Sequence, residues 1–172
     1  MKEIEKTYLA KFLPPDLGKA ESKEIIDLYI PHSLPHPKIR IRKHDNEFAI
    51  TKKVNIHGLN NALHEETSIK ITGEEFAGLK EIPSRKIEKT RYYYPYKGRN
   101  IEIDVFNGSL QGLVLVDVEF SDPAELEVFE MPDFCLSDVT EEKAFAGGRL
   151  CGKSYDDLLP VLNGYGYKKI EE

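Results

Sequence analysis

The feature that most constrains the fold is a succession of short segments in which apolar and polar residues alternate. They predict eight strands, at 3–9, 24–30, 38–43, 47–54, 64–71, 86–94, 99–106 and 111–119. The gaps hold turn formers such as Pro14-Pro15-Asp16, His44-Asp45-Asn46 and Asn107-Gly108, and several gaps have hairpin length. This order favours an antiparallel sheet that is closed, or nearly closed, into a barrel.

A few short helices are expected to pack outside this barrel. Their starts are signalled by capping residues with a carboxylate in the first turn, at Thr72, Asp122, Thr140 and Ser154. The last of these helices should end near Gly164. The sequence therefore predicts an α+β fold: an eight-stranded antiparallel closed β-barrel with a few short helices.

Length and charge limit the classes of protein to which the chain can belong. Its 172 residues suit one domain over residues 1–172, and 24 Lys and Arg against 30 Asp and Glu give a net charge of -6. An acidic chain is not expected to bind nucleic acid generally, and no apolar run approaches the roughly 20 residues that span a membrane. The N-terminus carries charge without an apolar segment, so we expect a cytoplasmic protein. The oligomeric state is not predicted.

Several of the predicted strands carry pairs of like charges at every second position. Because alternate side chains of a strand share a face, each pair points to one side. The pairs are Glu3 with Glu5, Arg40 with Arg42, Lys89 with Arg91, Glu102 with Asp104, and Asp117 with Glu119. For one strand alone, a charged face toward water is the simpler interpretation. A solvated face usually mixes signs, however, whereas these strands are either acidic or basic.

If a closed sheet turned these faces inward, carboxylates and cations would meet in one cavity. Carboxylates bind hard cations such as Mg²⁺, which also bind phosphate oxygens. Arg and Lys bind phosphate oxygens directly, Arg through a bidentate fork. The pattern therefore allows a metal–polyphosphate site inside a barrel, with ordinary solvated faces as the alternative.

The same strands resemble, in order, the motifs of the CYTH domain, the triphosphate tunnel metalloenzyme family. Glu3-Ile4-Glu5 resembles the start of its ExExK signature, 38–43 its RxR strand, 50–53 its TxK element, 89–93 its KxR strand, 102–106 its ExD strand and 112–120 its ExE strand. The resemblance covers nearly the whole chain, and the ordered set is specific.

The resemblance implies a tunnel that binds a triphosphate with divalent metal and hydrolyses inorganic triphosphate or a related compound. The residues that it assigns to the substrate are Arg40, Arg42, Lys53, Lys89 and Arg91, with Arg149 near one mouth. Those that it assigns to one or two Mg²⁺ or Mn²⁺ ions are Glu3, Glu5, Glu66, Asp104, Asp117 and Glu119. Of these, Glu5 and Glu119 are also expected to be catalytic. No protein nucleophile is needed.

One position departs from the family pattern. Thr7 stands where the ExExK signature has lysine. This difference leaves the rate of hydrolysis and the identity of the substrate open. The alternatives are an activity like that of class IV adenylate cyclases or thiamine triphosphatases, and a non-catalytic module that binds polyphosphate. His64 shares a strand face with Glu66 and is a further candidate for ligand contact.

Overall fold

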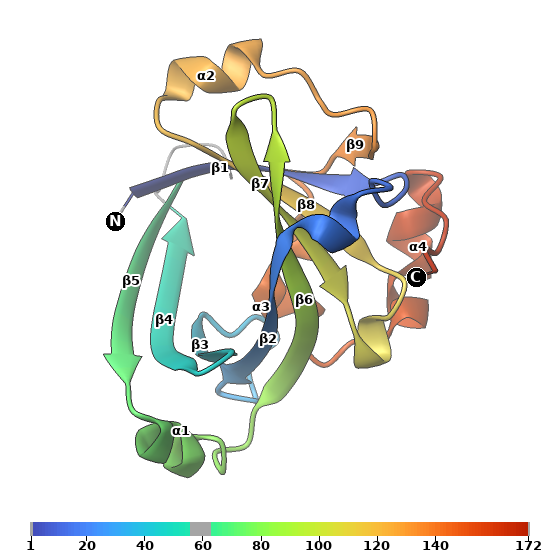
Figure 1. The fold of residues 1–172 in the computed structure, drawn as a ribbon. Helices are drawn as coiled ribbons and strands as arrows, with labels where there is room; N and C mark the ends of the chain where they lie inside the picture. The colour runs from blue at the N-terminus through green and yellow to red at the C-terminus, as the bar shows by residue number, and fades with distance from the viewer. Residues whose placement is uncertain (1, 56–62, 172) are drawn as a thin grey trace.

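The computed structural model describes residues 2–55 and 63–171, and the side chains of residues 4–54 and 65–171. Its main element is a nine-stranded sheet in the order β5-β4-β3-β2-β6-β7-β8-β1-β9 (Figure 1). The strands are β1 (Lys2–Ala10), β2 (Glu21–Ile30), β3 (Ile39–His44), β4 (Glu47–Asn55), β5 (Leu63–Ile71), β6 (Arg85–Tyr96), β7 (Arg99–Phe106), β8 (Val114–Phe120) and β9 (Cys135–Asp138). Neighbouring strands pair antiparallel.

All eight predicted strands are present as β1–β8, so the predicted antiparallel α+β class is confirmed. Strand β1 meets β8 along one edge and β9 along the other. It also pairs with β5, through Lys2 with Glu65 and Ile4 with Leu63. The four-residue β9 was not predicted, because so short a segment shows no clear alternation.

The helices are α1 (Gly73–Leu79), α2 (Pro123–Val128), α3 (Gly147–Leu150) and α4 (Tyr155–Gly164). In the part of the chain that the structure describes, 3₁₀ turns cover Leu17–Lys19, Gly108–Leu110 and Lys143–Phe145. Helices α1 and α4 begin with capping boxes on Thr72 and Ser154, and the Asp122 carboxylate caps α2, as predicted.

The helix predicted to start at Thr140 was wrong. Thr140 Oγ1 donates to Asp138 Oδ1 at 2.6 Å and accepts from the Thr7 backbone N–H at 3.1 Å. Its hydroxyl is therefore used to join β9 to β1 and does not cap a helix. The chain instead passes through the 3₁₀ turn, which Glu142 caps, before α3 begins.

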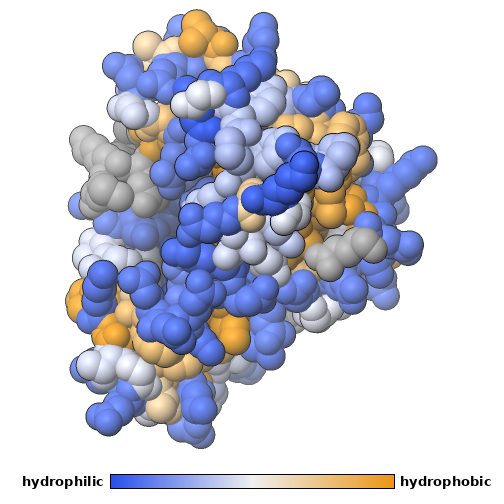
Figure 2. Space-filling view, viewed as in Figure 1, coloured by the Kyte–Doolittle hydropathy of each residue, from blue (hydrophilic) through white to orange (hydrophobic). Residues whose placement is uncertain are grey.

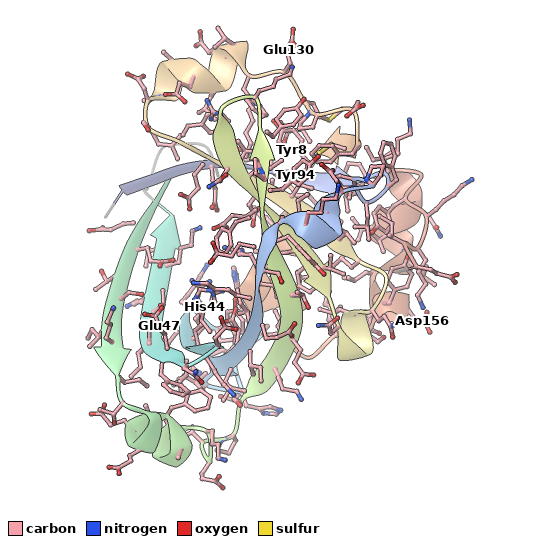
Figure 3. All side chains as sticks on the ribbon, in the orientation of Figure 1. Tyr8, His44, Glu47, Tyr94, Glu130 and Asp156 are labelled. Atoms are coloured by element: carbon pink, nitrogen blue, oxygen red, sulfur yellow. The ribbon has the colours of Figure 1, made fainter. Side chains whose placement is uncertain are left out.

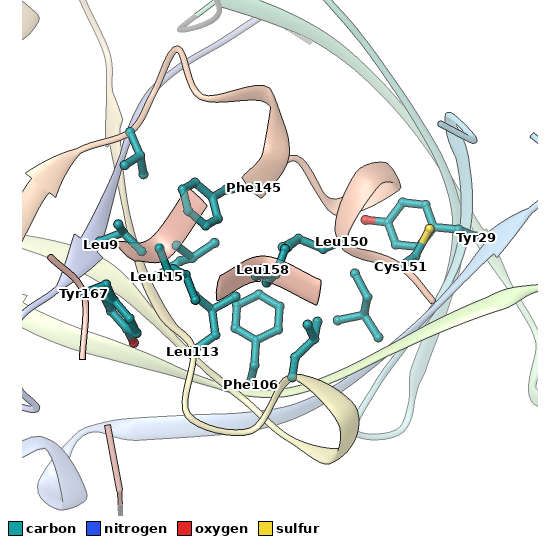
Figure 4. Close-up of a cluster of buried hydrophobic side chains, with 14 residues drawn as sticks. Leu9, Tyr29, Phe106, Leu113, Leu115, Phe145, Leu150, Cys151, Leu158 and Tyr167 are labelled. Atoms are coloured by element: carbon teal, nitrogen blue, oxygen red, sulfur yellow. The ribbon is translucent and has the colours of Figure 1, made fainter. Parts of the chain in front are cut away.

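Apolar residues lie on the outer face of the acidic strands. Ile101, Ile103 and Val105 of β7 are almost fully buried, together with Val116 and Val118 of β8. A second cluster packs at one end of the sheet against α3 and α4, where Leu150 and Leu158 meet Phe106, Leu113 and Leu115 (Figure 4). Burial of these outer faces leaves the charged faces of β7 and β8 to point to the other side.

The middle of the face shown in Figure 2 is dominated by hydrophilic residues. Among the described residues, none of the helices has both the length and the apolar character needed to cross a membrane.

Candidate functional site

A cavity of about 560 Å³ lies against the inward faces of β1–β8. Every one of these strands contributes charged or polar side chains to its wall: Glu5 and Thr7, Asp27 and Tyr29, Arg40 and Arg42, Thr51 and Lys53, Glu66, Lys89 and Arg91, Glu102 and Asp104, and Asp117 and Glu119, in strand order. Members of each pair are two residues apart. The sheet therefore turns the like-charged faces toward one cavity, and the interpretation as ordinary solvated faces was wrong for these strands.

Three neighbouring strands, β1, β8 and β7, bring carboxylates face to face. In the strand register Glu5 lies opposite Glu119, and Glu102 lies opposite Asp117. Like charges directly opposite each other destabilise a sheet, so this arrangement has a cost to folding. Burial, together with the nearby charges of Glu5 and Asp104, raises the pKa of Asp117 to about 6.

Strand β6 places its cations against this acidic wall. Arg91 donates to Asp104 through Nε at 2.6 Å and Nη2 at 2.7 Å, and it also donates to Glu102. Lys89 Nζ contacts the same Asp104 carboxylate. Burial alone would raise the pKa of Asp104, but the charges of Arg91 and Lys89 outweigh it and hold that pKa well below its usual range. Burial lowers the pKa of Lys89, against the attraction of Asp104.

A second buried ion pair joins β2 and β3. Arg42 donates to Asp27 through Nε and Nη2, both at 2.7 Å, and only 2% of Asp27 is exposed. Burial would raise the pKa of the Asp27 carboxyl, but the charge and hydrogen bonds of Arg42 hold it well below its usual range. This bidentate contact fixes the guanidinium plane of Arg42 at the cavity wall.

Two further cations, on β3 and β4, contact carboxylates of β5 and β1. Arg40 Nη2 donates to Glu66 Oε2 at 3.2 Å, and Lys53 Nζ donates to Glu5 Oε1 at 2.6 Å. Among the described side chains, Arg40 Nε is buried without a hydrogen-bond partner. An unpaired buried N–H is costly, so this donor is suited to an oxygen that enters the cavity.

Polar side chains crowd the space between β3–β4 and β6–β7 (Figure 3). His44 of β3 lies there, with its Nε2 at 3.3 Å from the Tyr93 hydroxyl of β6. This contact joins strands on either side of β2.

The structure brings together almost every side chain that was predicted for the site. All of them line this cavity, Arg149 of α3 included, apart from Glu3. The side chains of Glu3 and His64 lie outside the described residues.

Sequence reasoning missed Asp27 and Tyr29 and left Glu102 out of the site. Asp27 interrupts an otherwise apolar stretch of β2. Because an acidic residue is rarely buried unless it is paired, this position could have been recognised as a candidate site residue. Glu102 shares the inward face of β7 with Asp104, so the same alternation would have included it. Tyr29 gives no such signal, because a tyrosine in a strand is usually part of the core.

No group of three or more His, Cys, Asp or Glu side chains among the described residues is arranged to hold a metal ion. The donor chemistry nevertheless fits a hard divalent cation, because the acidic wall offers only carboxylate oxygens. Glu5 lies opposite Glu119 in the strand register, and beside them burial and nearby carboxylates raise the pKa of Asp117 to about 6.

No protein-family model matches the chain. It is 31% identical over 147 residues to the inorganic triphosphatase of Nitrosomonas europaea, across 84% of this chain and 93% of that protein. It is 29% identical over 121 residues to the inorganic triphosphatase of Acetivibrio thermocellus, across 70% of this chain and 75% of that protein. A crystal structure of an inorganic triphosphatase superposes on this chain with a TM-score of 0.64 at 26% sequence identity. The superposition covers 87% of this chain and 93% of the chain in that crystal structure. The chain belongs to the CYTH-like triphosphate tunnel family.

Proposed function

We propose that this protein hydrolyses inorganic triphosphate, or a closely related triphosphate compound, with the help of a divalent metal ion. The observation that carries the proposal is the cavity in which cations of β3, β4 and β6 face carboxylates of β1, β7 and β8. Relatives that are themselves inorganic triphosphatases support it.

The sheet would act as a closed tunnel. Support comes from the pairing of β1 with β5, which connects the two ends of the eight-strand order β5-β4-β3-β2-β6-β7-β8-β1. Closure would present charged groups to the substrate from all sides and limit the access of water.

The substrate would bind to Arg40, Arg42, Lys53, Lys89 and Arg91. Each of these cations contacts a carboxylate of the cavity wall. A triphosphate would compete for the same donors, and the planar forks of Arg40 and Arg42 suit phosphate oxygens. Arg40 Nε, which is buried and has no partner among the described residues, would gain one if a phosphate oxygen reached it.

The carboxylates freed from these contacts would bind Mg²⁺ or Mn²⁺, with Glu3, Glu5, Glu66, Asp104, Asp117 and Glu119 as the proposed set. When bound, such an ion neutralises phosphate charge and lowers the pKa of a coordinated water. Glu5 and Glu119 would be the catalytic carboxylates, because they face each other across β1 and β8 and can orient the attacking water between them.

Triphosphate hydrolysis would require few further groups from the protein. Phosphoryl transfer depends mainly on positioning and on stabilising charge, so no protein nucleophile is required. Thr7, which replaces the lysine of the signature, hydrogen-bonds Asp117 and does not add a cation. The inward cations of β3, β4 and β6 would therefore supply the positive charge on the substrate.

The test is phosphate release from inorganic triphosphate, ATP and thiamine triphosphate, each with Mg²⁺, Mn²⁺ or a chelator. We expect the fastest release from inorganic triphosphate, and none with chelator. Formation of cyclic AMP from ATP would favour the cyclase-like alternative. Calorimetric binding of triphosphate without phosphate release would favour the non-catalytic module.

A further inference from the structure

Strand β2 contributes a carboxylate to the cavity that is more enclosed than those of Glu5 and Glu66. Only 2% of Asp27 is exposed, and its two oxygens accept from Arg42 Nε and Nη2, each at 2.7 Å. In the strand register Arg42 lies opposite Asp27 on β3, whereas the residue opposite it on β6 is the buried Ile87. Among the described side chains, Arg42 is the one cation within 4.0 Å of the Asp27 carboxylate.

The surroundings of Asp27 offer nothing that could replace Arg42. Its neighbours on the same face of β2 are Ile25 and Tyr29, and both are buried. A phosphate that drew the guanidinium of Arg42 away would therefore leave a buried carboxylate without a counter-charge. Breaking one side of a buried ion pair in this way is strongly unfavourable.

The other cations of β3 and β4 are held less firmly. Arg40 contacts Glu66, of whose side chain 19% is exposed, and Lys53 contacts Glu5, of whose side chain 18% is exposed. Water or a metal ion can reach these two carboxylates, so a phosphate can take Arg40 and Lys53 without leaving a bare buried charge behind.

Arg42 can meet an anion without leaving Asp27. The fork uses Nε and Nη2, and in the described part of the chain Nη1 takes part in no hydrogen bond with the protein. Nη1 is not one of the buried atoms that lack a partner, and Arg42 lines the cavity. The outer edge of the guanidinium is thus open to the space in which a phosphate would lie.

We propose that Asp27 is a positioning residue for substrate: its fork with Arg42 persists when triphosphate binds, and it aims Nη1 of Arg42 at a phosphate oxygen. The inference rests on the proposed function, because it takes triphosphate as the ligand. Asp27 itself touches neither the phosphates nor a metal ion, since both of its oxygens already accept from Arg42.

Nuclear magnetic resonance of the arginine Nε–H groups tests the persistence of the fork in the wild-type protein. Triphosphate is added in the presence of chelator, so that it is bound without being hydrolysed, and the Arg40 and Arg42 signals are assigned from the Arg40→Lys and Arg42→Lys variants. The Arg42 Nε–H signal should shift little and stay protected from exchange with solvent, whereas that of Arg40 should shift. An Arg42 signal that shifts as far as that of Arg40, or that loses its protection, would overturn the proposal.

The positioning role is tested by Asp27→Asn, which keeps the shape of the side chain but cannot accept both N–H groups. Its Kd and KM for triphosphate should rise about tenfold, the usual order for a charge-assisted hydrogen bond to phosphate. Its kcat should change less than about twofold, because the lost contact serves bound substrate and transition state alike. In an Arg42→Ala background, Asp27→Asn should have no further effect on Kd. Glu24→Gln, at an exposed position on the other face of β2, is the matched control.

An unchanged Kd in folded Asp27→Asn would overturn the proposal. A further loss of affinity in the Arg42→Ala background would also overturn it, because Asp27 would then act on the fold and not through Arg42. Circular dichroism checks that the variants fold, and the resonance experiment on the wild-type protein decides the question if Asp27→Asn does not. If wild type binds triphosphate but releases no phosphate with Mg²⁺, while Kd still depends on the fork, the hydrolytic function fails and the positioning role stands.

Discussion

Thr7 donates its hydroxyl hydrogen to Asp117 Oδ1 at 2.7 Å, across the pairing of β1 with β8. The two residues lie directly opposite each other in the register, at the position where the family signature has a lysine in β1. A lysine there would neutralise Asp117, whereas the threonine only hydrogen-bonds it. Burial and the nearby carboxylates of Glu5 and Asp104 raise the pKa of Asp117 to about 6, although Arg91 Nη2 lies 3.6 Å from its Oδ2.

This raised pKa makes the stability of the ligand-free protein depend on pH. An unfolded Asp117 releases its proton near its ordinary pKa of 3.8, whereas the folded residue keeps it until about pH 6. Between these values the folded state binds more protons, so the contribution of Asp117 to the free energy of unfolding falls as pH rises through this window. Above about pH 6 the buried Asp117 is charged, and its destabilising effect on the folded state is fully present.

We therefore expect Asp117→Asn to stabilise the ligand-free protein relative to wild type at about pH 7.5 but not at about pH 4, by on the order of 1–3 kcal/mol. Urea unfolding in chelator at the two pH values measures this difference. Asp133→Asn, at an exposed position, is the control. A stability difference that is the same at both pH values would mean that Asp117 titrates in the folded protein much as it does in the unfolded chain.

Glu5→Gln is expected to abolish metal-dependent phosphate release while the fold is retained. The substitution keeps the shape of the side chain, so no cavity opens. It removes a charge that faces Glu119, which relieves repulsion, and it leaves Lys53 with a neutral acceptor in place of a carboxylate. Phosphate release and the circular dichroism spectrum check the two parts of the prediction. Glu127→Gln, at an exposed position in α2, should release phosphate like wild type. Normal turnover in Glu5→Gln would remove Glu5 from the proposed metal set.

Arg40→Ala should weaken triphosphate binding more than Lys43→Ala. Both residues lie in β3, but Arg40 lines the cavity and Lys43 does not. Loss of a charge-assisted contact to phosphate typically costs about 1.5–3 kcal/mol, which is about tenfold or more in Kd. Calorimetric titration with triphosphate measures both variants. A similar loss of affinity in both variants would show that the face of β3 on which a residue lies does not determine triphosphate binding.

Triphosphate with Mg²⁺ should raise the melting temperature of the protein. A ligand that binds only the folded state adds RT ln(1 + [L]/Kd), about 2.7 kcal/mol at a hundredfold excess over Kd. For a domain of this size each kcal/mol raises Tm by about 2–4 °C. Sulfate should raise it less, because a single anion cannot reach from Arg40 to Arg91. Melting curves with triphosphate plus Mg²⁺, triphosphate plus chelator, and sulfate would decide this, and an unchanged Tm with triphosphate and Mg²⁺ would count against a tunnel site.

Local rules in the sequence determined the strands, most helix starts and the grouping of charge on alternate positions. Alternation along Arg99–Phe106 and the capping boxes at Thr72 and Ser154 act over a few residues, so they can be read without knowledge of the fold. The like-charged pairs also predicted that charged faces of several strands could meet in one cavity.

Tertiary structure alone decided which face of each strand lines the cavity and which charges meet. The Asp27–Arg42 fork and the Thr7–Asp117 hydrogen bond depend on register between strands. The approach of Arg149 to Lys38 depends on how α3 packs against the start of β3. Side-chain alternation defines two faces of a strand but gives no preference between them. That preference arises only when the apolar faces of β7 and β8 are buried on the outside and the charged faces are left to point inward.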